Sequence, residues 1–214
     1  MLVIGLTGSI GMGKSTAANR FRTHGIAVFD ADAAVHQLYS GAAVQRIEEA
    51  FPGTTGDGVV DRQRLLAALM ADPNAFKRLE SIVHPLVRVL EGEFLRGEAA
   101  KGAAMAVLEV PLLFETGGDK FCDVTVVVST TSAIQRERVL SRPGMTPAKL
   151  DEILSRQLPD TEKRRKADFV VDTGGTIPDS EAQIDKLIAQ LKTRIGSVYQ
   201  RHWASSLKLS DEPK

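Results

Sequence analysis

The residues best suited to chemistry form a glycine-rich loop near the N-terminus. Gly8, Gly11 and Gly13 precede Lys14 and Ser15 in the order of a phosphate-binding loop, which is a glycine, four free positions and then Gly-Lys-Ser/Thr. Glycines let the backbone wrap around phosphates, and the helix that follows adds the positive end of its dipole. Lys14 can reach the β- and γ-phosphates, and the Ser15 hydroxyl can ligate Mg²⁺. The loop predicts binding of a nucleoside triphosphate.

Two carboxylates, Asp30 and Asp32, directly follow the second apolar run of the chain. Phosphoryl transfer to an alcohol needs a carboxylate that orients the hydroxyl and accepts its proton, and Asp32 is the best-placed candidate for this base. The alternatives are structural: Asp30 as a helix N-cap, and Asp32 as a first-turn acid that complements the helix dipole. We favour the base for Asp32 and leave Asp30 open.

Three further residues have both a functional and a structural interpretation. Glu109 ends a predicted strand, where an acid either joins the Mg²⁺ shell of a phosphate-loop protein or is an ordinary strand-end carboxylate. Glu115 either faces the acceptor or caps a turn. His84 precedes Pro85, where the chain is biased away from helix, and is either a structural group or an acceptor contact.

A basic segment extends from Arg136 to Lys166. We expect it to act as a lid that places at least one arginine over the transferring phosphate. The alternative is a solvated helical face with salt bridges. We assign the triplet Lys163-Arg164-Arg165 to that solvated face.

Apolar, β-branched runs alternate with helical patterns, which predicts an α/β fold with a parallel sheet covered on both faces. The predicted strands are Leu2–Leu6, Ile26–Phe29, Ala104–Val110, Val124–Val128 and Asp168–Val171. The predicted helices between and after them include Ser15–Thr23, Ala31–Tyr39, Ser132–Ser141 and an amphipathic Ser180–Ile195.

The stretch from Asp30 to Gly102 exceeds what one strand connection requires. We expect an all-helical insertion there, with helices at Ala43–Ala50, Asp61–Met70 and from Pro73 to about Leu95. Such an insertion commonly holds the second substrate of an α/β enzyme.

The composition is that of an ordinary globular protein: 214 residues, 43% hydrophobic and 25% charged. Lys plus Arg number 27, as do Asp plus Glu, so no global positive field favours nucleic acid or an anionic membrane as a partner. The single cysteine, Cys122, cannot form an internal disulfide, which favours a cytoplasmic location. We expect no membrane span, no signal peptide and no obligate protein partner.

Several motifs in series resemble the dephospho-coenzyme A kinase family over roughly residues 2 to 175. They are Gly5 to Ser15, Asp30-Ala31-Asp32, Ile82-Val83-His84-Pro85, Val110-Pro111-Leu112-Leu113-Phe114-Glu115, Arg138 with Arg142, Arg156-Gln157 and Ala167 to Asp172. Many enzymes share the phosphate loop, whereas the later motifs in this order are far more specific.

The resemblance implies a P-loop kinase that moves the γ-phosphate of ATP to the ribose 3′-hydroxyl of dephospho-coenzyme A, the last step of coenzyme A synthesis. It implies that Asp32 is the base, that the triphosphate cradle runs from Gly11 to Thr16, and that Arg138 and Arg142 are lid arginines. The predicted site comprises catalytic Asp32, Lys14, Arg138 and Arg142; ATP-binding Gly8, Gly11, Met12, Gly13, Lys14, Ser15 and Thr16; acceptor-binding Asp32, His84, Leu113 and Glu115; and, for Mg²⁺, Ser15 with Glu109 as an open candidate.

The chain departs from the family pattern at a few positions. Ser9 and Met12 replace a frequent glycine and serine, both at free positions of the loop. Glu109 stands where aspartate is frequent. Thr173 replaces a frequent asparagine near the adenine site, so we do not predict it as a contact.

We expect one kinase unit divided into functional parts. Its core comprises residues 1–30, 103–131 and 167–203, with an acceptor-binding insertion at about 31–102, a lid at about 132–166 and a flexible tail at 204–214. The nearest alternative is a P-loop kinase for another small alcohol or nucleotide. A GTP-driven switch is disfavoured because its Asp-x-x-Gly element, Asp172 to Gly175, follows the last strand and no Asn-Lys-x-Asp motif occurs.

Overall fold

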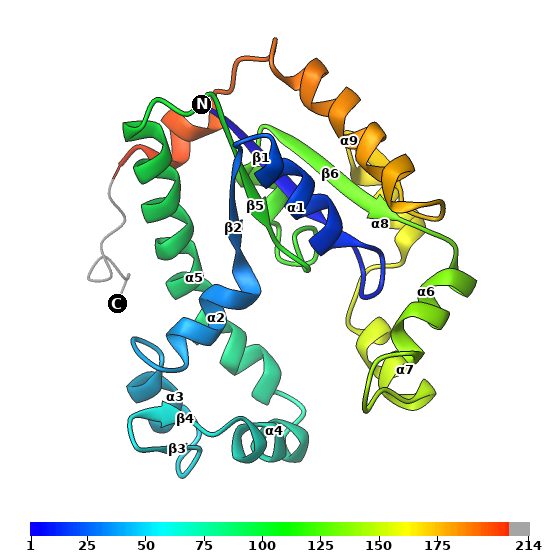
Figure 1. Cartoon of the computed structure of the whole chain (residues 1–214). Coiled ribbons are helices and arrows are strands. Elements are labelled where there is room, and N and C mark those ends of the chain that lie inside the picture. Colours follow the sequence, from blue (N-terminus) through cyan, green and yellow to red (C-terminus); the bar gives the residue numbers. More distant parts are fainter. Residues whose placement is uncertain (206–214) are drawn as a thin grey trace. The chain divides into compact units, whose positions relative to one another are not determined.

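The first feature of the fold is a five-stranded sheet in the order β2-β5-β1-β6-β7 (Figure 1). The computed structural model describes residues 1–205, so most of the predicted tail at 204–214 lies outside the described residues. The strands are β1 (Leu2–Thr7), β2 (Ala27–Asp30), β5 (Met105–Glu109), β6 (Val124–Ser129) and β7 (Phe169–Asp172). All the predicted strands are confirmed, with shifts of single residues at their ends.

The register brings the ends of the strands to one edge of the sheet. β1 pairs in parallel with β5 and β6, and β6 pairs in parallel with β7. Leu6 lies beside Glu109, and Ser129 lies beside Asp172. Since parallel strands end at the same edge, the loop after β1, the end of β5 and the residues after β7 meet there.

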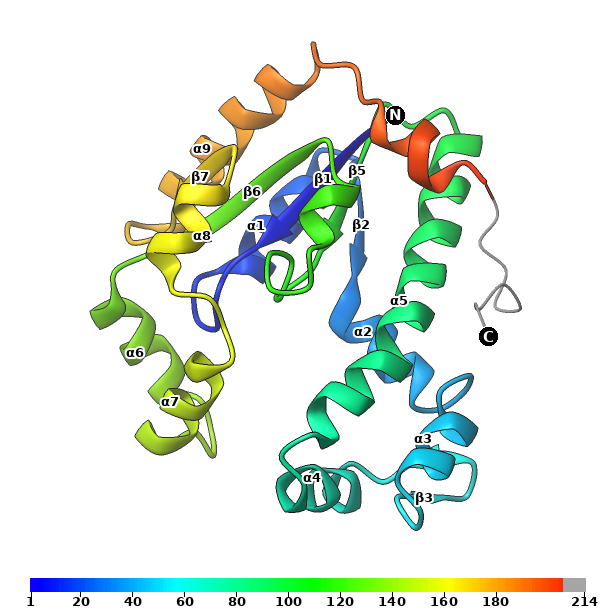
Figure 2. The ribbon, with the colours of Figure 1, turned by 180° about the vertical axis from the view of Figure 1, so that it is seen from behind.

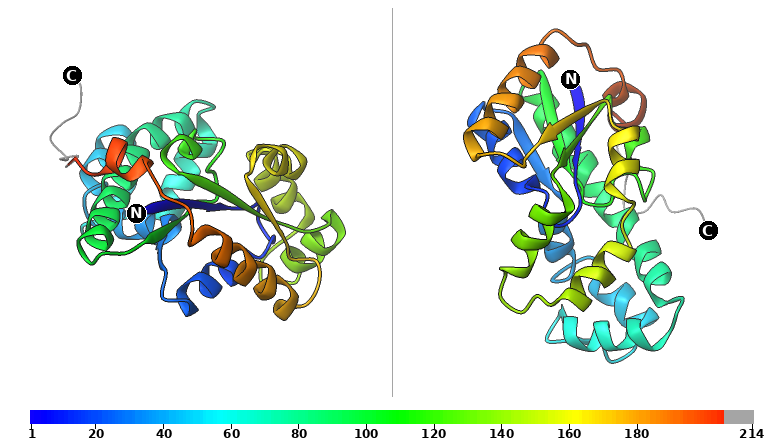
Figure 3. Two further views of the ribbon diagram at one scale, coloured as in Figure 1. Left: turned by 90° about the horizontal axis from the view of Figure 1, so that it is seen from above. Right: turned by 90° about the vertical axis from the view of Figure 1, so that its right-hand side faces the viewer.

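Helices cover both faces of this sheet, which explains the unbroken apolar strands. α1 (Lys14–Thr23) and α9 (Ile177–Leu191) pack together on one face, and α8 (Asp160–Lys166) packs beside β6 on the other (Figures 1, 2 and 3). The buried core between them includes Ile4, Leu6, Phe21, Val107, Val126, Ile184 and Leu187. Each such side chain stabilises the fold by roughly 1.5–3 kcal/mol through burial.

The last predicted helix needs a correction at both ends. α9 begins at Ile177 rather than Ser180, because Thr176 and Asp179 form a reciprocal capping box. It ends at Leu191, so Ile195 lies beyond the apolar face and is 97% exposed. The rest of the predicted apolar face is buried: Ile184, Leu187, Ile188 and Leu191.

The segment predicted as a lid contains three helices joined by short connections. α6 (Ser132–Leu140) is capped by the Thr131 hydroxyl, and α7 (Pro147–Ser155) is capped by the Thr146 hydroxyl. α8 completes the segment. Arg142 lies in the connection between α6 and α7.

Two compact units divide the described chain. The first unit comprises residues 1–29 and 95–205, and the second unit comprises residues 30–94 of the described chain. The second unit contains α2 (Ala31–Leu38), α3 (Val44–Ala50), the hairpin of β3 (Thr55–Gly56) and β4 (Val59–Val60), α4 (Arg62–Ala71) and most of α5 (Ala75–Ala100). It has its own core, which includes Leu38, Ile47, Phe51, Leu65, Leu69, Val83 and Leu86.

The prediction that the insertion is all-helical is therefore wrong at one place, where β3 and β4 form a hairpin. Thr55 pairs with Val60 in an antiparallel hairpin, and Asp57 and Gly58 form its turn with φ values of 51° and 77°. Such an Asp-Gly pair suits a tight hairpin turn because both residues tolerate positive φ. Glu48 accepts hydrogen bonds from Gly53 N (2.7 Å) and Thr55 N (3.0 Å) beside the hairpin. These bonds lower the pKa of Glu48.

The helix predicted from Pro73 to about Leu95 is confirmed by α5, which continues through Pro85 despite the local bias away from helix. A proline in a helix costs about 3 kcal/mol, since it removes one backbone hydrogen bond and crowds the preceding turn. Val83, Leu86 and Val89 are buried at helical spacing around it, and this packing outweighs the cost. Within residues 1–205, no helix combines the length and apolar character needed to cross a bilayer.

A buried carboxyl group lies further along α5. Glu91 is 4% exposed, and its Oε2 lies 3.1 Å from Arg88 Nη1. Burial raises the pKa of Glu91 to about 7, although Arg88 acts in the opposite direction. The native state therefore holds a proton that an unfolded chain releases near pH 4.5.

We expect Glu91→Gln to raise the free energy of unfolding by about 3 kcal/mol at pH 8 and to leave it unchanged at pH 4. Between pH 4.5 and about 7 only the native state holds the Glu91 proton, so wild-type stability falls as pH rises through this window. Urea unfolding at several pH values measures this, with the exposed Glu93→Gln as control. Parallel curves for Glu91→Gln and wild type from pH 4 to pH 8 would contradict it.

Candidate active site

The glycine-rich loop joins β1 to α1, as predicted. Gly11 and Gly13 have φ values of 78° and 85°, which L side chains rarely adopt, and Gly13 is the N-cap of α1. A Cβ at Gly8 would collide with Val128 of β6. Lys14 is the first residue of α1, Ser15 is exposed, and Thr16 is half-buried. The loop therefore has the backbone of an anion-binding cradle.

Met12 and Thr173 fasten this loop to the end of the sheet. The Met12 side chain is 2% exposed, and its Sδ lies 3.2 Å from Thr130 N. The Thr173 hydroxyl lies 2.9 Å from Met12 O and 3.2 Å from Ser129 O, and a Cβ at Gly13 would contact Thr173. Met12 can therefore offer only its backbone to a nucleotide. Thr173 was not predicted to contact the nucleotide, and its hydroxyl instead supports the loop through the Met12 carbonyl.

Lys14 forms an ion pair with Glu109 at the end of β5. Lys14 Nζ lies 2.7 Å from Glu109 Oε1, and Arg22 Nη2 lies 3.7 Å from Glu109 Oε2. The Glu109 side chain is only 4% exposed. Such a buried carboxylate depends on its cationic neighbours, because desolvation penalises an unpaired charge. The structure thus brings together three predicted site elements: the loop, Lys14 and Glu109.

The two predicted lid arginines differ in their surroundings. Arg138 of α6 donates from Nη2 to Thr173 O at 2.7 Å, and it is half-buried. This contact places Arg138 on the same threonine that supports the loop. Arg142 is exposed in the connection after α6.

Glu115 and Lys163 form a buried ion pair, which corrects the assignment of the Lys163-Arg164-Arg165 triplet to a solvated face. Lys163 is fully buried; its Nζ lies 2.9 Å from Glu115 Oε1 and 3.1 Å from Pro111 O. Glu115 Oε1 also accepts from Leu158 N at 2.8 Å. Arg164 and Arg165 are exposed, as predicted. Glu115 therefore connects the loop after β5 to the start of α8.

We expect Lys163→Met to lower the free energy of unfolding by about 3 kcal/mol, because it leaves the Glu115 carboxylate buried without its cation. Urea unfolding measures the change, and the exposed neighbour Arg164→Met, the control, should stay within about 0.5 kcal/mol of wild type. Adding Glu115→Leu to Lys163→Met should restore part of the loss. Equal effects of Lys163→Met and Arg164→Met would contradict this.

The loop after β5 also contains Leu113, which is 1% exposed. A Cβ at Gly5 would meet its side chain at 2.7 Å, so Leu113 packs against β1. The side chains of Leu113 and Glu115 are both engaged within the protein. Their predicted contacts with the acceptor stay predictions.

Asp32 and His84 belong to the second unit. Asp30 is the N-cap of α2 and accepts from Ala33 N at 3.0 Å, which settles its open assignment as a cap. Asp32, in the first turn of α2, is exposed. His36 Nδ1 lies 2.9 Å from Asp32 O, and Arg62 Nη1 lies 2.7 Å from His36 Nε2. Since an arginine only donates, Nε2 of His36 is the acceptor of the contact with Arg62.

His84 lies within α5 of the second unit, on an exposed part of the helix. Desolvation lowers the pKa of His84, and Arg88 adds to this effect while Glu80 opposes it. A neutral imidazole at neutral pH can donate or accept a hydrogen bond. Its role as an acceptor contact stays a prediction.

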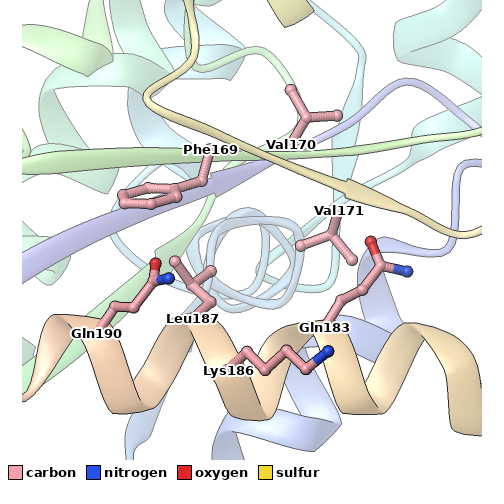
Figure 4. Close-up of a pocket in the computed structure, with 7 residues that line it drawn as sticks. All are labelled: Phe169, Val170, Val171, Gln183, Lys186, Leu187 and Gln190. Carbon is pink, nitrogen blue, oxygen red and sulfur yellow. The ribbon is translucent and has the colours of Figure 1, made fainter.

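A shallow hollow lies between β7 and α9 (Figure 4). Phe169 and Leu187 contribute apolar walls, and Gln183 lies at one end. Gln183 Oε1 accepts from Asp172 N at 2.9 Å, and Gln183 Nε2 donates to Asp172 O at 2.8 Å. This amide thus holds the residue before Thr173.

Comparison with known proteins identifies the family. The family model described as "Dephospho-CoA kinase" matches residues 2–179 of the chain. Curated proteins of that name from Rhodopseudomonas palustris and Rhizobium etli are each 58% identical to the chain, over 188 and 195 residues. These matches cover 88% and 91% of this chain and 94% and 96% of the relatives. The chain belongs to the dephospho-CoA kinase family.

Solved structures agree with the fold of this dephospho-CoA kinase family member. A crystal structure from Thermus thermophilus has a TM-score of 0.73 at 34% identity and covers 89% of this chain and 97% of its own. The dephospho-CoA kinase from Campylobacter jejuni has a TM-score of 0.67 at 24% identity, covers 89% of this chain and 96% of its own, and supports the fold. The predicted P-loop-type α/β fold and the family resemblance are confirmed.

The residues of this dephospho-CoA kinase family member fit ATP with Mg²⁺. Side chains at Gly8 and Gly11 would collide with Val128 and Val139, so only glycine fits the backbone of this loop, and Ser15 is exposed beside Lys14. Glu109 supplies a carboxylate oxygen, the ligand type that Mg²⁺ prefers, although Lys14 engages it here. The site thus contains suitable groups for the nucleotide and for the metal.

Proposed function

We propose that the chain moves the γ-phosphate of ATP to the ribose 3′-hydroxyl of dephospho-coenzyme A. ATP-dependent phosphorylation of dephospho-coenzyme A, which yields coenzyme A and ADP, is the activity of its family, and the chain is a kinase of this type. The observation that carries the proposal is Lys14, set between a glycine cradle and a buried carboxylate.

Lys14 is proposed to exchange one anionic partner for another. Its Nζ lies 2.7 Å from Glu109 Oε1. When ATP occupies the cradle, Lys14 turns to the β- and γ-phosphates and stabilises the charge that develops during transfer. Ser15 and the released Glu109 are the groups that would hold Mg²⁺. The metal would supply charge neutralisation at the phosphate oxygens.

Asp32 is proposed as the base that orients the acceptor hydroxyl and takes its proton. Its carboxylate is exposed and therefore accessible to a substrate, and Asp30 beside it performs the capping of α2. His36 bonds the Asp32 carbonyl and so holds the backbone of this turn. His84, Leu113 and Glu115 remain the proposed acceptor-binding residues.

Arg138 and Arg142 are proposed to act on the nucleotide in different ways. Arg138 is held in advance by Thr173, beside the loop, and can contact phosphate with little movement. Arg142 is exposed and would reach the phosphates only when its segment closes. Closure excludes water and suppresses hydrolysis of ATP without acceptor.

Two acceptor analogues test the position of transfer. The protein is incubated with ATP, Mg²⁺ and either dephospho-coenzyme A, its 2′-deoxyribose analogue or its 3′-deoxyribose analogue, and products are weighed by mass spectrometry. Dephospho-coenzyme A and the 2′-deoxy analogue should gain one phosphoryl group, and the 3′-deoxy analogue should gain none. Phosphorylation of the 3′-deoxy analogue would refute the proposed position. Turnover of shikimate or gluconate in place of dephospho-coenzyme A would refute the substrate.

A further inference from the structure

Two backbone groups of Ile10 in the glycine-rich loop, its N–H and its carbonyl, are held by two glutamine side chains. Ile10 N donates to Gln157 Oε1 at 3.2 Å, and Ile10 O accepts from Gln135 Nε2 at 2.8 Å. Gln135 lies in α6, and Gln157 lies between α7 and α8. Both come from the segment at 132–166, which approaches the loop on the side of α6 (Figures 1 and 2).

Each glutamine is itself fixed by its surroundings. Gln135 is 6% exposed, and a Cβ at Gly11 would meet Gln135 O at 3.1 Å, so the loop rests directly on α6. Gln157 precedes Leu158, whose N donates to Glu115. Glu115 is in turn paired with the buried Lys163. The two amide groups are therefore presented to Ile10 from a rigid base.

The polarity of these bonds matters for an anion site. A phosphate cradle works when N–H groups face the anion and carbonyl oxygens do not. The Ile10 carbonyl would repel a phosphate, and the Gln135 amide donates a hydrogen bond to it. A carbonyl can only accept and an N–H can only donate, so the chemistry fixes which end of each glutamine amide faces Ile10.

We propose that Gln135 and Gln157 are positioning residues of the ATP site, which hold the backbone of Ile10 with its carbonyl turned to the protein. This inference rests on the proposed function, because it assumes that the cradle binds ATP. Neither glutamine needs to touch the nucleotide. They hold the loop in the conformation that binds phosphate, so that ATP binding does not require a rearrangement of the Ile10 backbone.

A matched pair of substitutions tests the proposal. Gln157→Glu keeps an oxygen acceptor for Ile10 N, whereas Gln135→Glu replaces the donor to Ile10 O with an acceptor. Each variant adds one negative charge to the same side of the loop, so their difference reports the hydrogen bond to the Ile10 carbonyl. The readouts are the dissociation constant of ADP with Mg²⁺ by calorimetry, the KM values of both substrates, kcat and the thermal midpoint.

We expect Gln135→Glu to weaken ADP binding roughly 10- to 100-fold more than Gln157→Glu, because a buried carbonyl then faces a carboxylate instead of a donor. The KM of dephospho-coenzyme A should be unchanged in both. Equal weakening in the two variants would show that only the added charge matters, and would overturn the proposal. A lower thermal midpoint with wild-type ADP affinity would overturn it as well.

An uncharged variant covers the case in which Gln135→Glu does not fold. Gln135→Met keeps a similar volume, removes the donor and adds no charge, and it should bind ADP about 10-fold more weakly than wild type. Unchanged ADP affinity in folded Gln135→Met would overturn the proposal. Because ADP affinity is measured without acceptor, this outcome is distinct from a failure of the wild-type protein to phosphorylate dephospho-coenzyme A.

Discussion

Lys14→Ala will lower kcat/KM for phosphoryl transfer by roughly 10³-fold, the largest effect that we expect from a single residue. Lys14 is the first residue of α1, at the positive end of the helix and next to the glycine cradle. A charged group aimed at the transferring phosphate stabilises the transition state more than the ground state, so its loss appears in kcat as well as in KM. Steady-state kinetics with ATP varied at saturating dephospho-coenzyme A measures both.

The alanine variant has a second effect that must be separated from the first. It removes the partner of Glu109, a carboxylate with 4% side-chain exposure, and leaves Arg22 at 3.7 Å as its cation. The double variant Lys14→Ala/Glu109→Gln removes that buried charge and should recover stability, but its kcat should stay well below that of the single variant Glu109→Gln, which measures what the proposed metal ligand contributes. Recovery of kcat in the double variant would mean that Lys14 acts through folding rather than on the phosphate.

Asp32→Asn will lower kcat by about 10²-fold or more and leave ATP binding close to that of wild type. Asparagine keeps the size of the side chain but cannot accept the acceptor proton. Because Asp32 is exposed in the first turn of α2, the substitution should change the stability of the protein little. Single-turnover transfer and calorimetric ATP binding measure the two expectations separately.

Asp30→Asn is the matched control for Asp32→Asn. It removes the same charge two positions earlier, and asparagine caps a helix as well as aspartate does, so the bond to Ala33 N is retained. We expect its kcat to stay within a few-fold of wild type. Full activity of Asp32→Asn, or an equal loss in both variants, would place the base elsewhere.

The sheet was predictable because its strands are local features of the chain. Each is a short apolar run buried on both faces, and such a run needs no knowledge of its partners to be seen. The β3–β4 hairpin was missed because each of its strands has only two residues, too few to show an alternating pattern. The helix through Pro85 was predicted from its long helical pattern, and packing around Val83 and Leu86 explains why the local preference at Pro85 does not interrupt it.

The candidate site was likewise predictable only where its residues are contiguous in the sequence. The glycine loop and Lys14 are contiguous in sequence, so a motif predicts them together. The contacts that hold them connect residues far apart in the chain: Glu109 to Lys14, Thr173 to Met12 and Gln157 to Ile10. Lys163 carried no local signal, because a lysine in a basic helix is normally solvated, and only the pairing with Glu115 accounts for its burial. The catalytic roles of Asp32, Arg138 and Arg142 stay predictions.

The ion pair between Lys14 and Glu109 affects which anions the cradle retains. A ligand gains from Lys14 only what exceeds the attraction that Glu109 already provides at 2.7 Å. Chloride or a single inorganic phosphate offers little beyond this, whereas a nucleotide polyphosphate offers several oxygens to the lysine and to the glycine amides together. We therefore expect the buried Glu109 carboxylate to compete with small anions for Lys14. This competition keeps common cellular anions from occupying the site that ATP needs.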